Sequence, residues 1–233
     1  LLNNVIQLFE RGAPNACEGH STNTNFMEYF RYGNHASCEA NEDLFKEVMV
    51  KDSKRGNTIL VDPCMTLFIP NLHVTPQAIV DVENVWKSPR PVFDSTWRPN
   101  IASFAINDWI DKITEGEVFF PGSFQRFLIS VYNLRISFPY DVIFLCDDDI
   151  TNAFRLIKIN PEVVSMHAFR GCGKLALSTG NTFGNTNCPF NFDQPATART
   201  QHASYLWTHR SDECIEKEKE HLALLTTEEV DTT

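Results

Sequence analysis

Residues 141–154 read Asp-Val-Ile-Phe-Leu-Cys-Asp-Asp-Asp-Ile-Thr-Asn-Ala-Phe, and no other part of the chain says more about its fold. The apolar run Val142–Cys146 predicts a short strand that is buried on both faces. The carboxylates of Asp147–Asp149 follow it and repel one another unless solvent, protons or cations compensate their charge. Strands that end in carboxylates hold divalent metal ions in phosphoryl-transfer enzymes. The alternative interpretations of such aspartates are a turn or a helix N-cap.

Three segments form an ordered set around this stretch. Asp149 begins an Asp-x-x-x-Ala-Phe pattern that ends at Phe154. Downstream, residues 182–192 read Thr-Phe-Gly-Asn-Thr-Asn-Cys-Pro-Phe-Asn-Phe. Upstream, residues 87–95 read Lys-Ser-Pro-Arg-Pro-Val-Phe-Asp-Ser, and residues 105–107 read Ala-Ile-Asn.

In their order and separations these segments resemble the reverse transcriptase domain of LTR-type retroelements. The resemblance covers about residues 74–200. It implies an α+β fold with part of the right-hand polymerase architecture, namely fingers and palm. It also implies an RNA-directed DNA polymerase that transfers nucleotides with two Mg²⁺ or Mn²⁺ ions. The implied partners are an RNA or DNA template-primer and deoxynucleoside triphosphates.

The resemblance assigns roles to residues at the predicted palm strand. Asp149 corresponds to the first catalytic aspartate, and the backbone carbonyl of Ile150 is a second metal ligand. Phe154 corresponds to an aromatic gate beneath the sugar, where a bulky ring disfavours a ribose 2′-hydroxyl. Without the resemblance, Phe154 would be a core residue, the commoner fate of a phenylalanine.

Other residues are assigned to the nucleotide. Arg90, and with it Lys87, would contact the triphosphate, because a guanidinium forks onto phosphate oxygens. Gly184 would let the backbone approach the nucleotide and template closely, beside Phe183. We expect Arg90 and the Phe183–Gly184 turn to line the cleft that Asp149 faces. The alternatives are two solvated basic residues in a proline-punctuated loop and a glycine turn with Phe183 in the core.

The chain departs from the family in one respect. A polymerase palm needs a further aromatic-x-Asp-Asp hairpin, whereas the only adjacent aspartates in this sequence are Asp147–Asp149. The chain also begins without Met. We therefore expect a fragment or decayed copy with little activity alone. Two alternatives stay open, a non-catalytic nucleic-acid- or protein-binding remnant of a retroelement, and an unrelated metal-dependent nuclease with further carboxylates near the cluster.

Composition limits the partners of the chain. Its 233 residues, 42% of them hydrophobic, suffice for a sizeable core, and they contain neither a membrane-spanning run nor a signal peptide, so we expect an intracellular protein without a membrane partner. A net charge of −10 argues against strong non-specific binding to nucleic acid. A local basic groove is nevertheless predicted from Lys87, Arg90, Arg98, Lys112, Arg126, Arg135, Arg155 and Lys158.

Seven cysteines without a secretory signal predict free thiols in a reducing compartment. Cys17-x-x-His20 and His35-x-x-Cys38 form a mirror-image set with zinc-ligand chemistry. The surrounding Asn, Ser, Thr and Gly residues indicate a loop, so half-buried or surface side chains are the alternative interpretation.

The expected organisation is a helical and loop extension over 1–58, a fingers-like region over 59–140, a partial palm over 141–208 and a charged, unstructured tail over 209–233. Hydrophobic periodicity and turn signals predict the individual elements. The helices are expected over 1–9, 42–50, 123–135, 153–158 and 194–207, and the strands over 58–61, 65–69, 79–80, 92–93 and 142–146, the last paired with a hairpin of 163–169 and 174–177.

Overall fold

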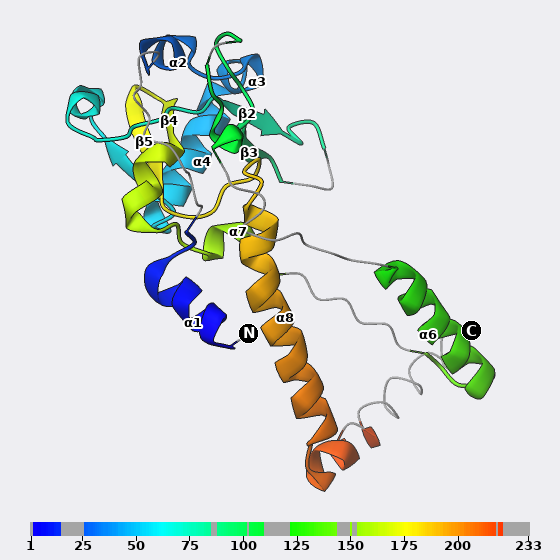
Figure 1. The fold of residues 1–233 in the computed structure, drawn as a ribbon. Helices are drawn as coiled ribbons and strands as arrows, with labels where there is room; N and C mark the ends of the chain where they lie inside the picture. The colour runs from blue at the N-terminus through cyan, green and yellow to red at the C-terminus, as the bar shows by residue number, and fades with distance from the viewer. Residues whose placement is uncertain are drawn as a thin grey trace.

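The computed structural model describes residues 2–14, 26–84, 88–101, 103–109, 122–143, 150, 153–217 and 219–220. The described part mixes helices with antiparallel strands (Figure 1). Its elements, with 3₁₀ helices written η, are α1 (Leu2–Arg11), α2 (Phe26–Tyr32), α3 (Ala36–Glu39), α4 (Glu42–Lys54), β1 (Thr58–Val61), η1 (Pro63–Leu67), β2 (Gln77–Val80), β3 (Arg90–Phe93), η2 (Ile106–Asp108), α6 (Ser123–Ser137), α7 (Ala153–Leu156), η3 (Pro161–His167), β4 (Ala168–Gly171), β5 (Lys174–Ser178) and α8 (Cys188–Thr208).

A three-stranded antiparallel sheet in the order β1-β5-β4 forms the centre of the fold. The predicted hairpin is confirmed as β4 and β5, although its first half begins only at Ala168, because 161–167 form η3 instead. Its turn residues, Cys172 at φ 52° and Gly173 at φ 70°, have the positive φ values that a two-residue type I′ turn needs. The predicted strand β1 pairs with β5, with Thr58 opposite Ser178.

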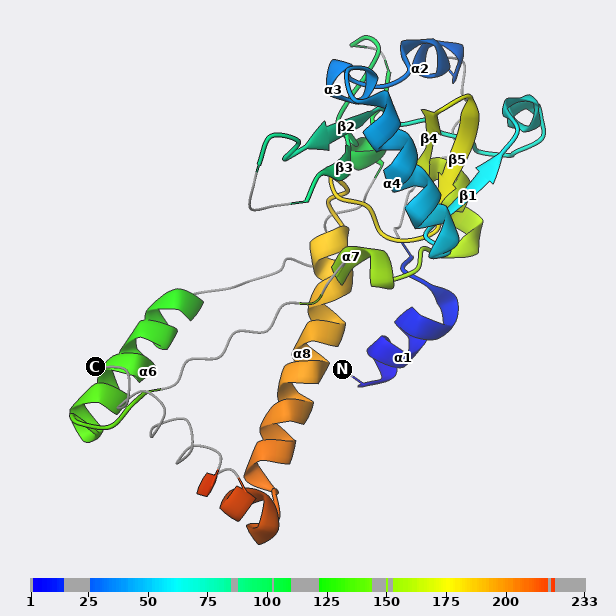
Figure 2. The same cartoon turned by 180° about the vertical axis from the view of Figure 1, so that it is seen from behind.

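Strands β2 and β3 form a separate antiparallel pair, in which Gln77 lies opposite Phe93. The helix expected over 42–50 is confirmed as α4, which ends at Lys54 and packs against both sheets (Figure 2). The core between them contains Phe45 and Met49 from α4, Phe93 from β3 and Phe169 from β4. This core fixes β3, and therefore its first residue, relative to the larger sheet.

A second core cluster lies on the side of α2. It contains Tyr29, Val74 and Leu175, and Tyr29 also contacts the buried imidazole of His73 edge-on at 4.8 Å. Burial lowers the pKa of His73 to about 4, because the charged form has lost its hydration. Burial, with His73 as a weaker cause, likewise lowers the pKa of His167 to about 3. Both imidazoles are therefore neutral at pH 7.

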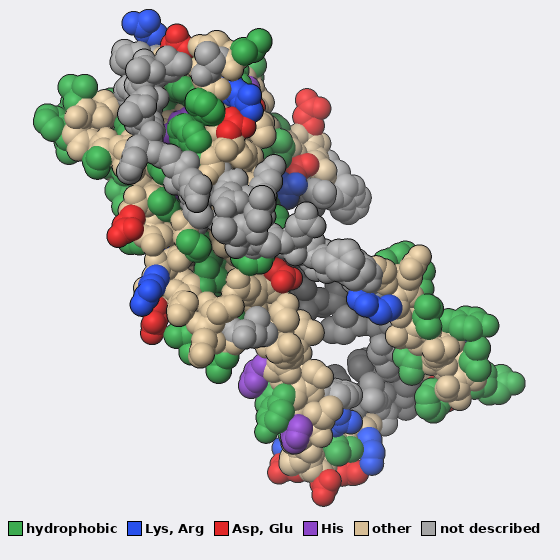
Figure 3. Space-filling model, viewed as in Figure 1, with side chains coloured by type: hydrophobic (Ala, Val, Ile, Leu, Met, Phe, Trp, Pro, Cys, Tyr) green, Lys and Arg blue, Asp and Glu red, His purple; other side chains and the backbone are tan. Residues whose placement is uncertain are grey.

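Helices α6 and α8 are confirmed and exceed their predicted lengths. The first turns of α8 contact α7 and α1, and the rest of α8 extends away from the sheets (Figures 1 and 2). Figure 3 shows hydrophobic side chains gathered on α6, which lies apart from the sheets. Phe124 and Tyr132 on this helix are exposed.

Two strand predictions are wrong within the described residues. Residues 65–69 belong largely to the 3₁₀ helix η1, because Asp62 accepts a hydrogen bond from the Cys64 amide at 3.0 Å and Pro63 favours the start of a helical turn. Val142 and Ile143 lie in no strand, and Val142 is 53% exposed. The rest of the predicted palm strand, 144–146, lies outside the described residues, and the central strand of the described sheet is β5.

The charged segment after α8 contains helix at its start. Residues 212–217, at the beginning of the expected unstructured tail, are helical. Lys217 Nζ lies 2.7 Å from Glu213 Oε1, an i,i+4 pair of the kind that supports an exposed helix.

Candidate functional site

Arg90 is the first residue of β3 and the centre of the candidate site. Its guanidinium carbon lies 5.4 Å from the centroid of the Phe183 ring, which is within the range of a cation–π contact. Its Nε lies 3.3 Å from Asp81 Oδ2. Asp81 follows β2 at φ 61°, in the turn towards β3. The side chain of Arg90 is nevertheless 49% exposed, so the guanidinium stays accessible to a ligand.

Three aromatic rings form a layer beside Arg90. The centroids of Phe183 and Phe154 are 5.0 Å apart, and Phe192 meets Phe154 edge-on at 5.8 Å. These rings come from the loop after β5, from α7 and from α8, so the layer joins segments that are far apart in the sequence. Phe154 and Phe183 are half-buried, so each ring packs against its neighbours and keeps part of its surface accessible.

Gly184 occupies a position that excludes a side chain. Its φ is 102°, and a Cβ there would lie 1.8 Å from the carbonyl oxygen of Phe93. The Phe93 amide donates a hydrogen bond to the Phe183 carbonyl at 2.9 Å. The Phe183–Gly184 turn is thus bound directly to the end of β3, and this requires glycine.

Asn107 fixes the other side of the same turn. Its Nδ2 donates to the Gly184 carbonyl at 2.9 Å, and its Oδ1 accepts from the Thr186 amide at 3.2 Å. Its own amide donates to the carbonyl of Ser95 at 3.0 Å. Sequence reasoning placed Asn107 in a motif without giving it a role. The side chain joins the segment after β3 to the turn, which makes it a positioning residue of the candidate site.

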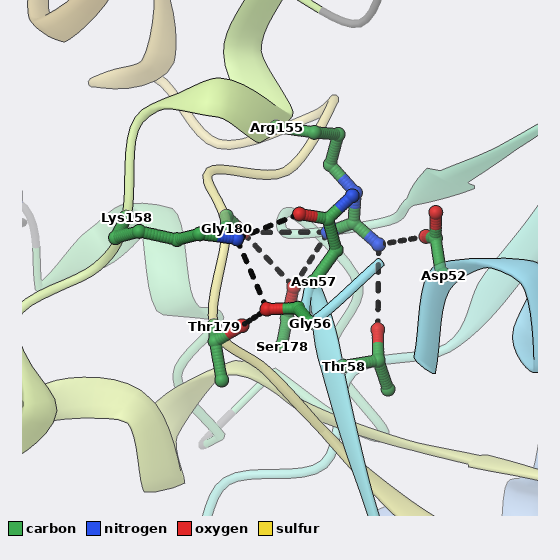
Figure 4. Close-up of polar contacts among 9 residues, drawn as sticks. All are labelled: Asp52, Gly56, Asn57, Thr58, Arg155, Lys158, Ser178, Thr179 and Gly180. Carbon is green, nitrogen blue, oxygen red and sulfur yellow. Dashed lines mark hydrogen bonds and ion pairs between the residues drawn. The ribbon is translucent and has the colours of Figure 1, made fainter. Parts of the chain in front are cut away.

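A polar network centred on the buried Arg155 connects α7 to α4 and to the end of β5 (Figure 4). Arg155 is 8% exposed and forms an ion pair with Asp52 on α4. Its Nη1 also donates to Ser178 Oγ at 2.6 Å. Lys158 Nζ donates to Asn57 Oδ1 at 2.7 Å, and burial, with the charge of Arg155 as a weaker cause, lowers the pKa of Lys158. Because Arg155 follows Phe154 directly, this network sets the position of the ring.

The predicted basic groove is wrong for Arg155, which is buried and used inside the molecule by the network in Figure 4. Lys158 is exposed, and its Nζ belongs to the same network. Arg98 Nη2 pairs with Asp108 Oδ1 at 2.5 Å. Arg135 Nη1 donates to two backbone carbonyls just beyond α6, at 3.2 and 3.0 Å. Sequence spacing could not show this, because each partner is set by tertiary structure.

The predicted metal ligands are described only in part. Asp147–Asp149, Lys87 and Lys112 lie outside the described residues. The carbonyl of Ile150 accepts a hydrogen bond from the Ala153 amide at 3.1 Å, which leaves one lone pair for another partner. Over the described ranges, no group of three or more His, Cys, Asp and Glu side chains has the arrangement of a metal site.

Of the four predicted zinc ligands, only His35 and Cys38 are described, and both make other contacts within the fold. Cys17 and His20 lie outside the described residues. One ring nitrogen of His35 lies 3.0 Å from Asp94 Oδ2, and the other lies 3.0 Å from a tyrosine hydroxyl. Cys38 donates to a backbone carbonyl of β2 at 3.2 Å, and burial raises the pKa of its thiol to about 12. Both described residues of the set are therefore engaged in hydrogen bonds within the fold.

No protein-family model matches this chain, and no curated protein matches it at a significant level. None of the helices in the described part of the chain has both the length and the apolar character needed to cross a membrane.

Proposed function

We propose that this chain is a reverse transcriptase-like protein of a retroelement, with part of a fingers-and-palm architecture, and that it binds a deoxynucleoside triphosphate at Arg90. One observation carries the proposal. Arg90, Phe154, Phe183 and Gly184, which the motif resemblance assigned to the nucleotide, come from distant segments and meet in one place. Local chain geometry does not produce such a meeting.

Arg90 would hold the triphosphate. Its ion pair with Asp81 uses Nε, so the two terminal nitrogens remain for phosphate oxygens. A guanidinium that donates two parallel hydrogen bonds to phosphate forms one of the stronger polar contacts in proteins. Asp81 and the Phe183 ring fix the guanidinium before the ligand arrives, which reduces the entropy cost of binding.

Phe154 would select the sugar and Gly184 would admit the nucleotide backbone. The half-buried Phe154 ring packs against Phe183 and Phe192, and these contacts restrict its rotation. The ring would therefore clash with a ribose 2′-hydroxyl. The exposed Gly184 presents main chain without a side chain, and Asn107 holds its carbonyl. The base and sugar would lie along this turn.

The proposed metal ligands are Asp149 and the remaining lone pair of the Ile150 carbonyl, which suit the hard oxygen preference of Mg²⁺ or Mn²⁺. When bound, the ions would neutralise charge on the phosphates. The partners in this proposal are an RNA or DNA template-primer and a deoxynucleoside triphosphate, in the cytoplasm or nucleus.

A second candidate function is a non-catalytic, protein-binding remnant of such an enzyme. Helix α6 favours it, because Phe124, Ile129 and Tyr132 expose apolar surface in the structure. Exposed apolar surface of this kind marks sites of protein association. The only adjacent aspartates in this sequence are Asp147–Asp149, so the second aspartate motif that a polymerase palm needs is missing from it. We therefore expect little templated incorporation of nucleotides in a primer-extension assay with Mg²⁺ or Mn²⁺.

Equilibrium titration with dTTP and Mg²⁺ tests the nucleotide site. We expect Arg90→Gln to weaken binding at least about tenfold, because it removes the charge and the paired hydrogen bonds to phosphate. Arg31→Gln is the matched control, because Arg31 lies exposed on α2. Equal affinities for the parent, Arg90→Gln and Arg31→Gln would contradict the proposal. Robust incorporation that disappears in Asp149→Asn would exclude the non-catalytic alternative.

A further inference from the structure

A cavity lies between α1 and the start of α8, separate from the Arg90 site. It has a volume of about 370 Å³, which is large enough for a small organic ligand. Two connections hold its walls together. The Ala13 amide donates to the Lys158 carbonyl at 2.6 Å, and the Asn160 amide donates to the Ala13 carbonyl at 2.9 Å. Leu8 packs with Ile157 and Ala13 in a small core beneath α1.

Gly12 lets the two walls approach each other. Its φ is 79°, and a Cβ there would lie 2.7 Å from the backbone nitrogen of Asn160. The close approach brings the end of α1 against the segment after α7. Backbone contacts thus fix the positions of two walls of the cavity.

Carboxamides dominate the lining. They converge on the cavity from three separate segments and are Asn4, Gln7, Asn160, Asn191 and Gln194. The Oε1 atom of Gln194 is buried and accepts no hydrogen bond within the described part of the protein. A buried acceptor of this kind is normally satisfied by a partner, and a donor in the cavity that reaches Gln194 Oε1 would satisfy it.

The remaining lining residues favour an anionic ligand with a flat ring. Arg11 supplies the one charged side chain among the described residues of the lining. None of the lining residues, all within the described ranges, is acidic, although the chain has 30 acidic and 20 basic residues. Phe190 adds an aromatic side chain, which suits stacking against a base.

We infer that this cavity binds a nucleotide, either as a free nucleoside monophosphate or as one unit of a single strand. Carboxamides pair with the donor and acceptor edge of a base, as Asn and Gln do with adenine. Gln194 would accept from the base, and Arg11 would bind the phosphate. The inference concerns a different site from Arg90 and does not rest on the polymerase proposal.

Calorimetric titration of the whole chain with AMP, GMP, CMP and UMP tests the inference, and anisotropy with a short labelled single-stranded DNA tests the strand as the source. We expect saturable binding of at least one nucleotide or of the strand. Gln194→Leu and Arg11→Gln should each weaken it about tenfold, because each removes one polar contact. Gln201→Leu on the exposed part of α8 and Arg55→Gln on the surface are the matched controls.

Titration with the corresponding nucleoside, which lacks the phosphate, distinguishes the role of Arg11 from that of Gln194. Arg11→Gln should weaken binding of a nucleotide and leave binding of the corresponding nucleoside unchanged, whereas Gln194→Leu should weaken both. Circular dichroism establishes that the variants fold. The absence of saturable binding to all four nucleotides and to the strand would overturn the inference, and so would equal affinities in all variants. Arg90→Gln should bind as the parent does, and loss of binding in that variant would place the nucleotide at Arg90 and overturn the inference.

Discussion

The body around the two sheets and the helix α6 use apolar residues in opposite ways. In the body, Phe45 and Phe169 are buried against partners from several elements. On α6, Phe124 is 71% exposed, and Phe127 and Ile136 are also exposed. Apolar spacing therefore predicts a helix, whereas tertiary contacts decide whether that helix belongs to a core or offers a surface.

Truncating one phenylalanine in each region gives the largest expected contrast. Phe169→Ala should lower the free energy of unfolding by about 3–5 kcal/mol, because it leaves a cavity in the core. Phe124→Ala should change it by less than about 0.5 kcal/mol, since the ring is largely in solvent. Urea denaturation of both variants measures the difference. Similar losses would show that α6 is packed in solution.

Ion pairs should show the same contrast between the body and the exposed end of the chain. Asp52→Ala leaves the buried guanidinium of Arg155 without its carboxylate and should cost about 3 kcal/mol of unfolding free energy. Glu213→Ala removes an exposed pair with Lys217 and should cost less than about 1 kcal/mol. Thermal melting followed by circular dichroism compares them. A Tm for Asp52→Ala equal to that of Glu213→Ala would contradict the burial of Arg155.

The buried histidines of the body should make its stability depend on pH. The pKa of His73 is lowered to about 4 in the folded protein, so the unfolded chain takes up its proton first as pH falls below about 6.5. Stability is complete above that pH and decreases towards pH 4, by about 2 kcal/mol for His73 at pH 5.

Denaturation at pH 7 and pH 5 measures this loss. His73→Phe should reduce the difference between the two pH values, whereas His202→Phe, on the exposed part of α8, should leave it unchanged. His167, whose pKa is lowered to about 3, keeps a remaining pH dependence in the variant. An unchanged pH dependence in His73→Phe would mean that its imidazole is not buried in solution.

Prediction from sequence succeeded where local pattern and tertiary structure agree. The helix expected over 42–50 is present as α4, and the turn residues Cys172 and Gly173 predicted the β4–β5 hairpin. It failed at 65–69 because Asp62-Pro63 starts a helical turn, a local signal that outweighs an apolar run. The strand expected at 142–146 was inferred from apolar content, and that content does not reveal a pairing partner.

The candidate site was predictable only through its motifs. The segments of Arg90, Phe154 and Phe183 could be named, because each lies in a pattern of residues. The contacts of Asn107 and Gln194 could not be predicted, since a carboxamide in the sequence does not show which distant backbone or cavity it faces. The buried ion pair of Arg155 could not be predicted for the same reason, and Arg155 was assigned to a basic groove instead.

A double-mutant cycle on dTTP binding with Mg²⁺ tests most directly whether Arg90 and Phe183 form one nucleotide site. Affinities are measured for the parent, Arg90→Gln, Phe183→Leu and the double variant. The contact at 5.4 Å predicts that the two effects do not add, with a coupling energy of about 1 kcal/mol. Equal affinities of all four proteins for dTTP would contradict a shared site. Losses of binding free energy in the two single variants that add up to the loss in the double variant, within about 0.3 kcal/mol, would contradict it too.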